Sequence, residues 1–293
     1  MPTIHRFIFC KIDFLICFCI FLSSLDLSGQ DIPSYIKTIP LGDDTVQLKV
    51  YKKSGENFVF AHVHENEVAS LEAGKQLLQT YGGKLVTIAH SFDGSTNRNV
   101  TFKSGNTVYA FDPNRIYSDD TNVLIKTIQV VKGSGKVDDK IVKMVKKLAD
   151  QIWQEVHEYP IIVAIHNNKN TPAELKTSWL FWQYLEPESY SIKSYIKSHD
   201  QTSDSNQSCT DIYINPQINN SEFFIVTQKQ DFDMLAKNRY NVVLQNDKPI
   251  DDGSMSVYAH GKNKRYINSE AKMGRVKEQV EMLEILLTGL FSK

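Results

Sequence analysis

The fold of this chain is organised around the stretch Phe58–Glu67, which reads FVFAHVHENE. Its apolar first half is typical of a buried strand, and its second half carries two histidines and two glutamates. Residues 67–80 have the pattern of a helix, which Gly82 and Gly83 bring to an end. We therefore expect ligand-type side chains where a strand ends and a helix begins, which is where open α/β sheets build their sites.

Apolar runs and amphipathic segments alternate along the rest of the chain. Strands are predicted at residues 84–90, 99–102, 107–111, 161–165, 223–227, 241–245 and 266–271. Helices are predicted at residues 136–156, 231–238 and 273–291, and a polar surface loop at residues 198–222. This alternation predicts an α/β fold with a mixed, mainly parallel central sheet flanked by helices.

Length and charge limit the classes of protein to consider. The chain has 293 residues, of which 41% are hydrophobic, which is enough for one large domain with a full core. Its net charge of −1 gives no indication of nucleic acid as a partner, because phosphate binding normally needs a basic excess. We expect residues 30–293 to form a single domain.

The N-terminus carries an almost continuously apolar run, Phe7–Leu25, which follows His5 and Arg6 and ends in small residues. This pattern predicts a secretory signal peptide over residues 1–29, and hence a secreted or periplasmic protein without stable membrane association after cleavage. A transmembrane anchor is the alternative, although Lys11 and Asp13 leave the uninterrupted part short for a span.

Of the four cysteines, only Cys209 lies outside the predicted signal peptide. The mature chain is therefore expected to have no internal disulfide. Because Cys209 lies in a polar stretch rich in Ser, Asn and Asp, we interpret it as incidental and not as a nucleophile.

Three ligand-type residues follow apolar strands: His64 with Glu67, and His166 directly after residues 161–165. Two histidines and one carboxylate form a standard catalytic zinc set that leaves one position open. Zinc at such a site acidifies water and polarises a carbonyl group. A competing ligand pair is His62 with His64, whose side chains share one side only if the strand is still regular there.

Two further elements lie at strand ends. Glu270 ends the last predicted strand just before a helix, where its carboxylate is suited to serve as a general base. Asn114 and Arg115 follow the strand at residues 107–111. The planar guanidinium of Arg115 is suited to bind a carboxylate in two-point fashion, and a surface salt bridge is the alternative.

The order of these motifs resembles the zinc carboxypeptidase superfamily, from about residue 58 to the end of the chain. The motifs are His64-x-x-Glu67, Asp112-Pro113-Asn114-Arg115, Ile165-His166-Asn167 and Glu270 before the final helix. They are most similar to the succinylglutamate desuccinylase and aspartoacylase branch. The resemblance implies a zinc-carboxypeptidase-like (phosphorylase/hydrolase-like) fold and one zinc ion. It also implies residue roles: His64, Glu67 and His166 as ligands, Asn114 and Arg115 gripping a substrate carboxylate, and Glu270 as general base.

The chain departs from the family pattern at several positions. Glu65 stands where the family usually has glycine, and Pro113 where it usually has leucine. Many relatives also carry an arginine before the Asn-Arg pair that polarises the scissile carbonyl, and here Lys103 or Arg98 would have to replace it. Since the chain ends soon after Glu270, we expect a bare peptidase-like domain without the additional C-terminal β domain of the acyl-amino-acid branch.

The sequence thus predicts a secreted zinc-dependent hydrolase that cleaves an amide bond next to a free carboxylate. The expected substrate is a peptide C-terminus, a cell-wall peptide or an N-acyl amino acid. The alternative is a catalytically inactive binding protein of the same fold. Four aromatic residues could either line the substrate pocket or pack in the core: Trp179, Trp182, Tyr184 and Tyr190.

Overall fold

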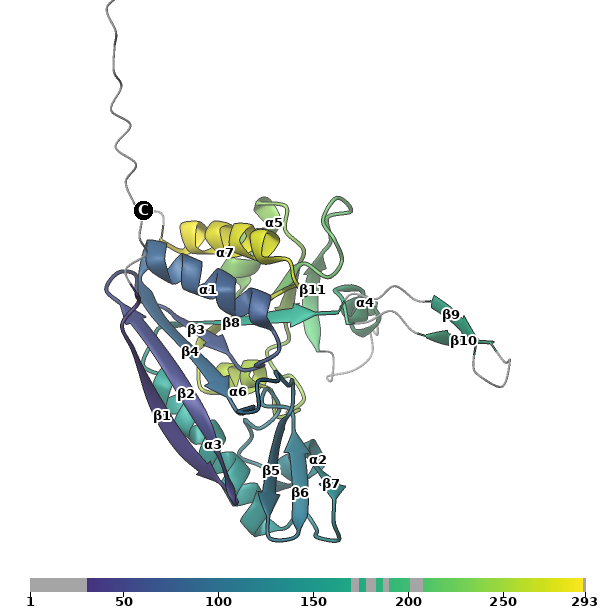
Figure 1. Cartoon of the computed structure of the whole chain (residues 1–293). Helices are drawn as coiled ribbons and strands as arrows, with labels where there is room; N and C mark the ends of the chain where they lie inside the picture. Colours follow the sequence, from purple (N-terminus) through teal and green to yellow (C-terminus); the bar gives the residue numbers. More distant parts are fainter. Residues whose placement is uncertain (1–30, 170–173, 178–182, 187–189, 201–207, 292–293) are drawn as a thin grey trace, which may run out of the picture. The chain divides into compact units, whose positions relative to one another are not determined.

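A nine-stranded mixed sheet runs through the compact unit formed by residues 32–293 (Figure 1). The computed structural model describes residues 31–169, 174–177, 183–186, 190–200 and 208–291. In spatial order the strands are β1 (Ser34–Leu41), β2 (Asp44–Lys53), β4 (Gly83–Ala89), β3 (Val59–His62), β8 (Ile161–Asn168), β14 (Arg265–Lys272), β12 (Phe223–Val226), β13 (Val242–Gln245) and β11 (Cys209–Tyr213).

The strand directions correct one expectation. The four central strands β4, β3, β8 and β14 are parallel, as is the pair β12–β13. Every other pairing in this sheet is antiparallel, and so are those of two smaller sheets. The predicted mixed sheet flanked by helices is confirmed, but "mainly parallel" is not, because four of the eight strand pairs of this sheet are antiparallel.

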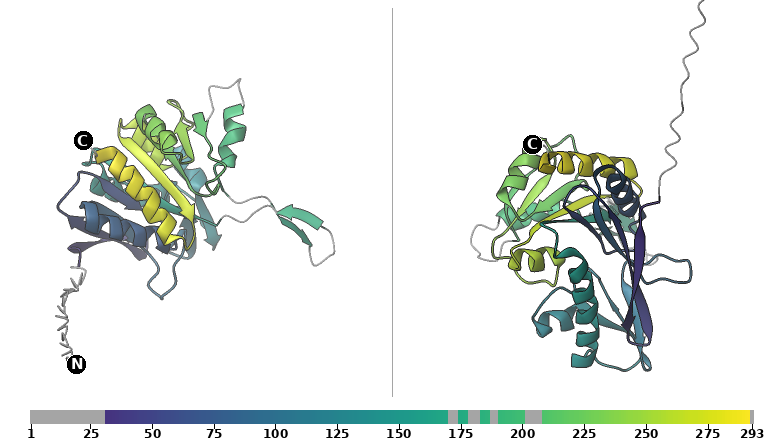
Figure 2. Two further views of the ribbon diagram at one scale, coloured as in Figure 1. Left: turned by 90° about the horizontal axis from the view of Figure 1, so that it is seen from above. Right: turned by 90° about the vertical axis from the view of Figure 1, so that its left-hand side faces the viewer.

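Helices cover both faces of the large sheet (Figures 1 and 2). Helices α1 (Val68–Tyr81), α5 (Lys229–Lys237) and α7 (Val276–Phe291) pack on one face, and α1 and α7 lie side by side. Helices α3 (Asp139–Val156) and α6 (Met255–Gly261) pack on the other. Strand β3 is therefore buried on both faces, which explains its continuous apolar run.

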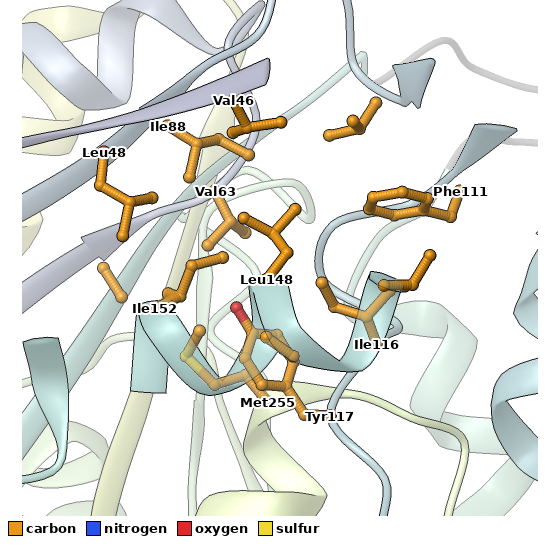
Figure 3. Close-up of a cluster of buried hydrophobic side chains, with 14 of the residues drawn as sticks. Val46, Leu48, Val63, Ile88, Phe111, Ile116, Tyr117, Leu148, Ile152 and Met255 are labelled. Carbon is orange, nitrogen blue, oxygen red and sulfur yellow. The ribbon is translucent and has the colours of Figure 1, made fainter. Parts of the chain in front are cut away.

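The α3 side of the sheet holds the larger apolar cluster (Figure 3). Val46, Leu48 and Ile88 of the sheet face Leu148 and Ile152 of α3 in this cluster. The stripe of α3 follows the helical spacing that the sequence predicts. This packing holds the central strands, and with them the residues at their carboxyl ends, against a rigid layer.

The remaining elements are smaller. A three-stranded sheet contains β5 (Val100–Ser104), β6 (Thr107–Phe111) and β7 (Ile128–Lys132), next to α2 (Thr121–Thr127) in the sequence. Strands β9 (Glu174–Thr177) and β10 (Gln183–Glu186) pair with each other, and α4 spans Lys193–Asp200. The sequence patterns did not predict three helices and four strands among the described residues: α2, α4, α6, β1, β7, β9 and β10.

In the part of the chain that the structure describes, no helix has both the length and the apolar character needed to cross a membrane. The predicted signal peptide at residues 1–29 lies outside the described residues and stays a prediction.

Candidate metal site and its cavity

His64, Glu67 and His166 meet at the carboxyl edge of two neighbouring parallel strands. Ala61 of β3 pairs with Ala164 of β8, so His64 and His166 follow shortly after the same level of the sheet. Glu67 occupies the N-cap position of α1, where its side chain makes no capping hydrogen bond and stays available to the site. All three side chains are buried.

The three side chains present donor atoms to one point. The Nδ1 atoms of His64 and His166 lie 3.0 Å apart. Oε1 of Glu67 lies 2.9 Å from Nδ1 of His64, and Oε2 of Glu67 lies 3.0 Å from Nδ1 of His166. Zinc bonds of about 2.0–2.1 Å in a tetrahedron separate the ligands by roughly 3.3 Å. This group could therefore hold a metal ion after adjustments of a few tenths of an ångström.

Asp112 determines which ring nitrogen of His64 faces the group. The Nε2 of His64 lies 2.7 Å from Oδ1 of Asp112, and an ionised carboxylate can only accept, so Nε2 carries the proton. The lone pair of Nδ1 is then free for a metal, as in the carboxylate–histidine pairs that orient metal ligands. In the sequence, Asp112 is part of the motif before Asn114 and Arg115, but this pattern does not predict that it belongs to the metal site.

The pKa values of the group follow from this arrangement. Burial by itself would raise the pKa of Glu67, but His166 and His64 together hold it well below its usual range. Burial would lower the pKa of His64, but Asp112 and Glu67 raise it. Glu67 is consequently a carboxylate at neutral pH, the form in which it can bind a cation.

The other histidine and the other glutamate of the opening stretch, His62 and Glu65, have structural contacts. His62 bonds through Nδ1 to Oγ1 of Thr87 at 2.8 Å and through Nε2 to the carbonyl oxygen of Glu67 at 3.0 Å. Burial lowers the pKa of His62 to about 4, so the ring is neutral. Glu65 accepts from the backbone N–H of Ser91 at 3.1 Å. His62 thus holds the backbone beneath Glu67, and the competing pair His62–His64 does not form a ligand group.

Arg98, one of two candidates for the cation near the scissile carbonyl, lies at the site. It donates from Nη1 to Oε1 of Glu67, and its Nη2 is 3.4 Å from Oδ2 of Asp112. Lys103, the other candidate, lies in strand β5 and does not line the cavity that Glu67, His166 and Arg98 line.

Glu270 faces the same cavity from strand β14, directly opposite His166 in the parallel register. Its carboxylate accepts from Nδ2 of Asn268 at 3.2 Å and from Nδ2 of Asn168 at 3.3 Å. Burial raises the pKa of Glu270, and the negative charge of Glu67 adds to this rise while His166 opposes it. A raised pKa favours proton transfer near neutral pH.

Asn114 and Arg115 belong to a tight turn after β6. The backbone N–H of Arg115 donates to the carbonyl of Asp112 at 2.9 Å, and that of Asn114 to Oδ1 of Asp112 at 2.8 Å. Proline suits the second position of such a turn, which accounts for Pro113. The same carboxylate that orients His64 therefore shapes the turn that carries Arg115.

The cavity, of about 660 Å³, is lined by His166, Glu67 and Glu270 together with Asn114 and Arg115. The sequence reading missed Asp252, whose Oδ2 accepts from Nη1 of Arg115 within this cavity. Its signal in the sequence is weak, because it lies in an acidic loop before α6 and follows no strand.

For one of the four aromatic residues, the structure decides between lining the pocket and packing in the core. Tyr190 lines the cavity, as does Tyr195. Trp179 and Trp182 lie outside the described residues, and so does the side chain of Tyr184.

Comparisons with known proteins extend to structures only. No family model and no curated protein sequence matches the chain. The ectoine utilization protein EutE from Ruegeria pomeroyi has 13% identity and a TM-score of 0.41, over 88% of this chain and 71% of that one. A succinylglutamate desuccinylase/aspartoacylase from Rhodobacter sphaeroides has 9% identity and a TM-score of 0.39, over 90% of this chain and 66% of that one. The cell shape determinant protein Csd4 from Helicobacter pylori has 9% identity and a TM-score of 0.40, over 84% of this chain and 54% of that one.

These neighbours include the group that the motifs resemble. At such identities and TM-scores the likeness assigns no activity to this chain.

Proposed function

We propose that this chain is a zinc-dependent hydrolase that cleaves an amide bond next to a free carboxylate. The observation that carries the proposal is the cluster of donor atoms from His64, Glu67 and His166, which contact one another at 2.9–3.0 Å. Glu67 and His166 line the same cavity as Glu270. A buried carboxylate with a raised pKa beside a group of this kind is the arrangement that activates water for attack on a carbonyl.

The ligands would be Nδ1 of His64, Nδ1 of His166 and the carboxylate of Glu67. When bound, zinc supplies Lewis acidity that polarises the carbonyl and makes water more acidic. Glu270 takes a proton from the attacking water and passes it to the leaving amine. Arg98 provides donors for the oxygen on which negative charge develops.

Asn114 and Arg115 would hold the carboxylate beside the scissile bond. Arg115 uses Nη1 for Asp252, and its guanidinium has further N–H donors for a substrate. Oδ1 of Asn114 is buried without a partner among the described residues, as expected of a group that meets a ligand. The substrate classes that fit are peptide C-termini, cell-wall peptides and N-acyl amino acids.

The location proposed for this activity is outside the cytoplasm, on the pattern of residues 1–29. Expression of the full chain and N-terminal sequencing of the protein in the medium or periplasm would check it. A product that begins at Gln30 is expected, and a cell-retained product that begins at Met1 would contradict it.

The hydrolase is tested with purified protein, Glu270→Gln, and Glu284→Gln as a control at an exposed helical position. We expect about one zinc per chain in all three, and a turnover of N-acylated dipeptides that falls about 10²–10⁴-fold in Glu270→Gln only. Absence of zinc would overturn the proposal. Zinc and peptide binding without any turnover would indicate the inactive binding protein instead.

A further inference from the structure

One wall of the cavity is a sheet face of which the proposed chemistry uses only Glu270. Asn268 precedes Glu270 by two residues, so both point to the same face of β14. Asn268 pairs with Ile225 of β12, which pairs with Val243 of β13. Gln245 follows Val243 by two residues and shares its face. Asn268, Ile225 and Gln245 all line the cavity.

This wall carries two buried polar atoms without a partner among the described residues. They are Oδ1 of Asn268 and Nε2 of Gln245, in side chains that are only 7% and 5% exposed. Glu270 determines which end of the Asn268 amide is unpaired, because a carboxylate accepts from Nδ2 and so leaves the acceptor Oδ1 without a partner. Buried polar groups are nearly always paired, so unpaired atoms in the wall of a cavity point to a ligand that pairs them.

The chemistry of the two atoms limits that ligand. One atom is an acceptor and the other a donor, and a carboxamide offers the complementary donor and acceptor. A carboxamide also pairs with either end of the Gln245 amide. A carboxylate can only accept and would leave Oδ1 of Asn268 unpaired, whereas a cationic side chain can only donate and would leave Nε2 of Gln245 unpaired. An aliphatic group would leave both atoms unpaired.

We propose that Asn268 and Gln245 form a subsite for an uncharged carboxamide side chain, with Gln245 as the residue that determines specificity. The position of the reacting bond rests on the proposed hydrolase function. β13 lies two strands beyond β14, roughly 10 Å across the sheet, which favours a long side chain of glutamine type on the residue that carries the free carboxylate.

The test compares N-acetyl-alanyl-glutamine with the methionine and glutamate analogues, which have similar size. Zinc-loaded wild-type protein is compared with Gln245→Leu and with Gln129→Leu, a control at an exposed position of β7. kcat/KM is measured for each peptide, and binding of each peptide is measured by calorimetry. Wild type and the control should prefer the glutamine peptide by at least about 10-fold. Gln245→Leu should lose this preference, and its kcat/KM for the methionine peptide should rise.

The two readouts separate this subsite from the hydrolase function. Turnover without a preference for glutamine in the wild type overturns the subsite and leaves the hydrolase standing. Absence of turnover, with a glutamine preference in binding that Gln245→Leu removes, overturns the hydrolase and supports the subsite. The wild-type ranking decides the matter even if Gln245→Leu fails to fold.

Discussion

Nε2 of His64 lies 2.7 Å from Oδ1 of Asp112, and this contact turns Nδ1 of His64 toward Glu67 and His166. The same Asp112 oxygen accepts from the backbone N–H of Asn114. One carboxylate therefore couples the orientation of a metal ligand to the turn that presents the substrate-binding pair.

Replacing Asp112 should weaken the site without removing a ligand. In Asp112→Ala the imidazole of His64 loses the acceptor that determines its tautomer, so we expect zinc affinity to fall about 10–100-fold. Competition with a chelating dye measures this, and Asp119→Ala, an exposed ion-paired aspartate, is the control. An unchanged affinity in Asp112→Ala would show that the contact does not orient the ligand.

His62 and His64 should respond differently to substitution. His64→Ala removes a donor atom and should abolish stoichiometric zinc binding. His62→Ala should retain zinc near one per chain, because His62 contacts Thr87 and the backbone of Glu67 and not the donor group. It should instead lower the free energy of unfolding by about 1–3 kcal/mol, since it leaves buried partners unpaired. Metal analysis and urea denaturation distinguish the two variants, and loss of zinc in His62→Ala would favour the competing pair.

A small substitution should disturb the packing of α1 beneath the site. A Cβ at Gly74 would lie 2.7 Å from Cδ1 of both Ile165 and Leu85, so Gly74→Ala should destabilise the protein by about 1–3 kcal/mol through overpacking. Gly261 meets no atom within 4 Å, and Gly261→Ala in α6 should be neutral or stabilising by up to about 1 kcal/mol. Thermal unfolding compares them, and equal midpoints would contradict the prediction.

The ion pair between Lys84 and Glu155 should make stability depend on acid pH. Nζ of Lys84 lies 2.6 Å from Oε2 of Glu155, and hydrogen bonds from Lys84 and Tyr35 lower the pKa of Glu155 although burial opposes them. A lowered folded-state pKa means that the stabilisation is present above the unfolded value of about 4.5 and is lost as pH falls through the lower folded value. Glu155→Gln should therefore lower the free energy of unfolding by about 1–2 kcal/mol at pH 7 and by much less near pH 3.

Urea denaturation at both pH values measures this difference. Glu281→Gln, in an exposed helical pair with Lys277, is the control and should change little at either pH. If Glu155→Gln lowers the free energy of unfolding by the same amount at pH 3 and pH 7, the ion pair is not the cause of that loss.

Much of the site was predictable because position in a sheet follows from local pattern. The apolar runs before His64 and His166 identify buried strands, and parallel neighbours end at one edge. Glu270 follows the same logic at the end of β14. Strand direction was not predictable in this way, because an apolar run is equally compatible with a parallel or an antiparallel neighbour. The β1–β2 hairpin and the β14–β12 pair are two of the antiparallel pairs because of which the predicted mainly parallel sheet is not confirmed.

The sequence by itself determined which side chains stand at strand ends, since periodicity and burial are properties of short segments. Only the tertiary structure decided which of them meet. It paired His64 with Asp112, brought Arg98 and not Lys103 to Glu67, and set Asp252 against Arg115. These contacts join residues from separate loops and strands, and no local pattern encodes the distance between them.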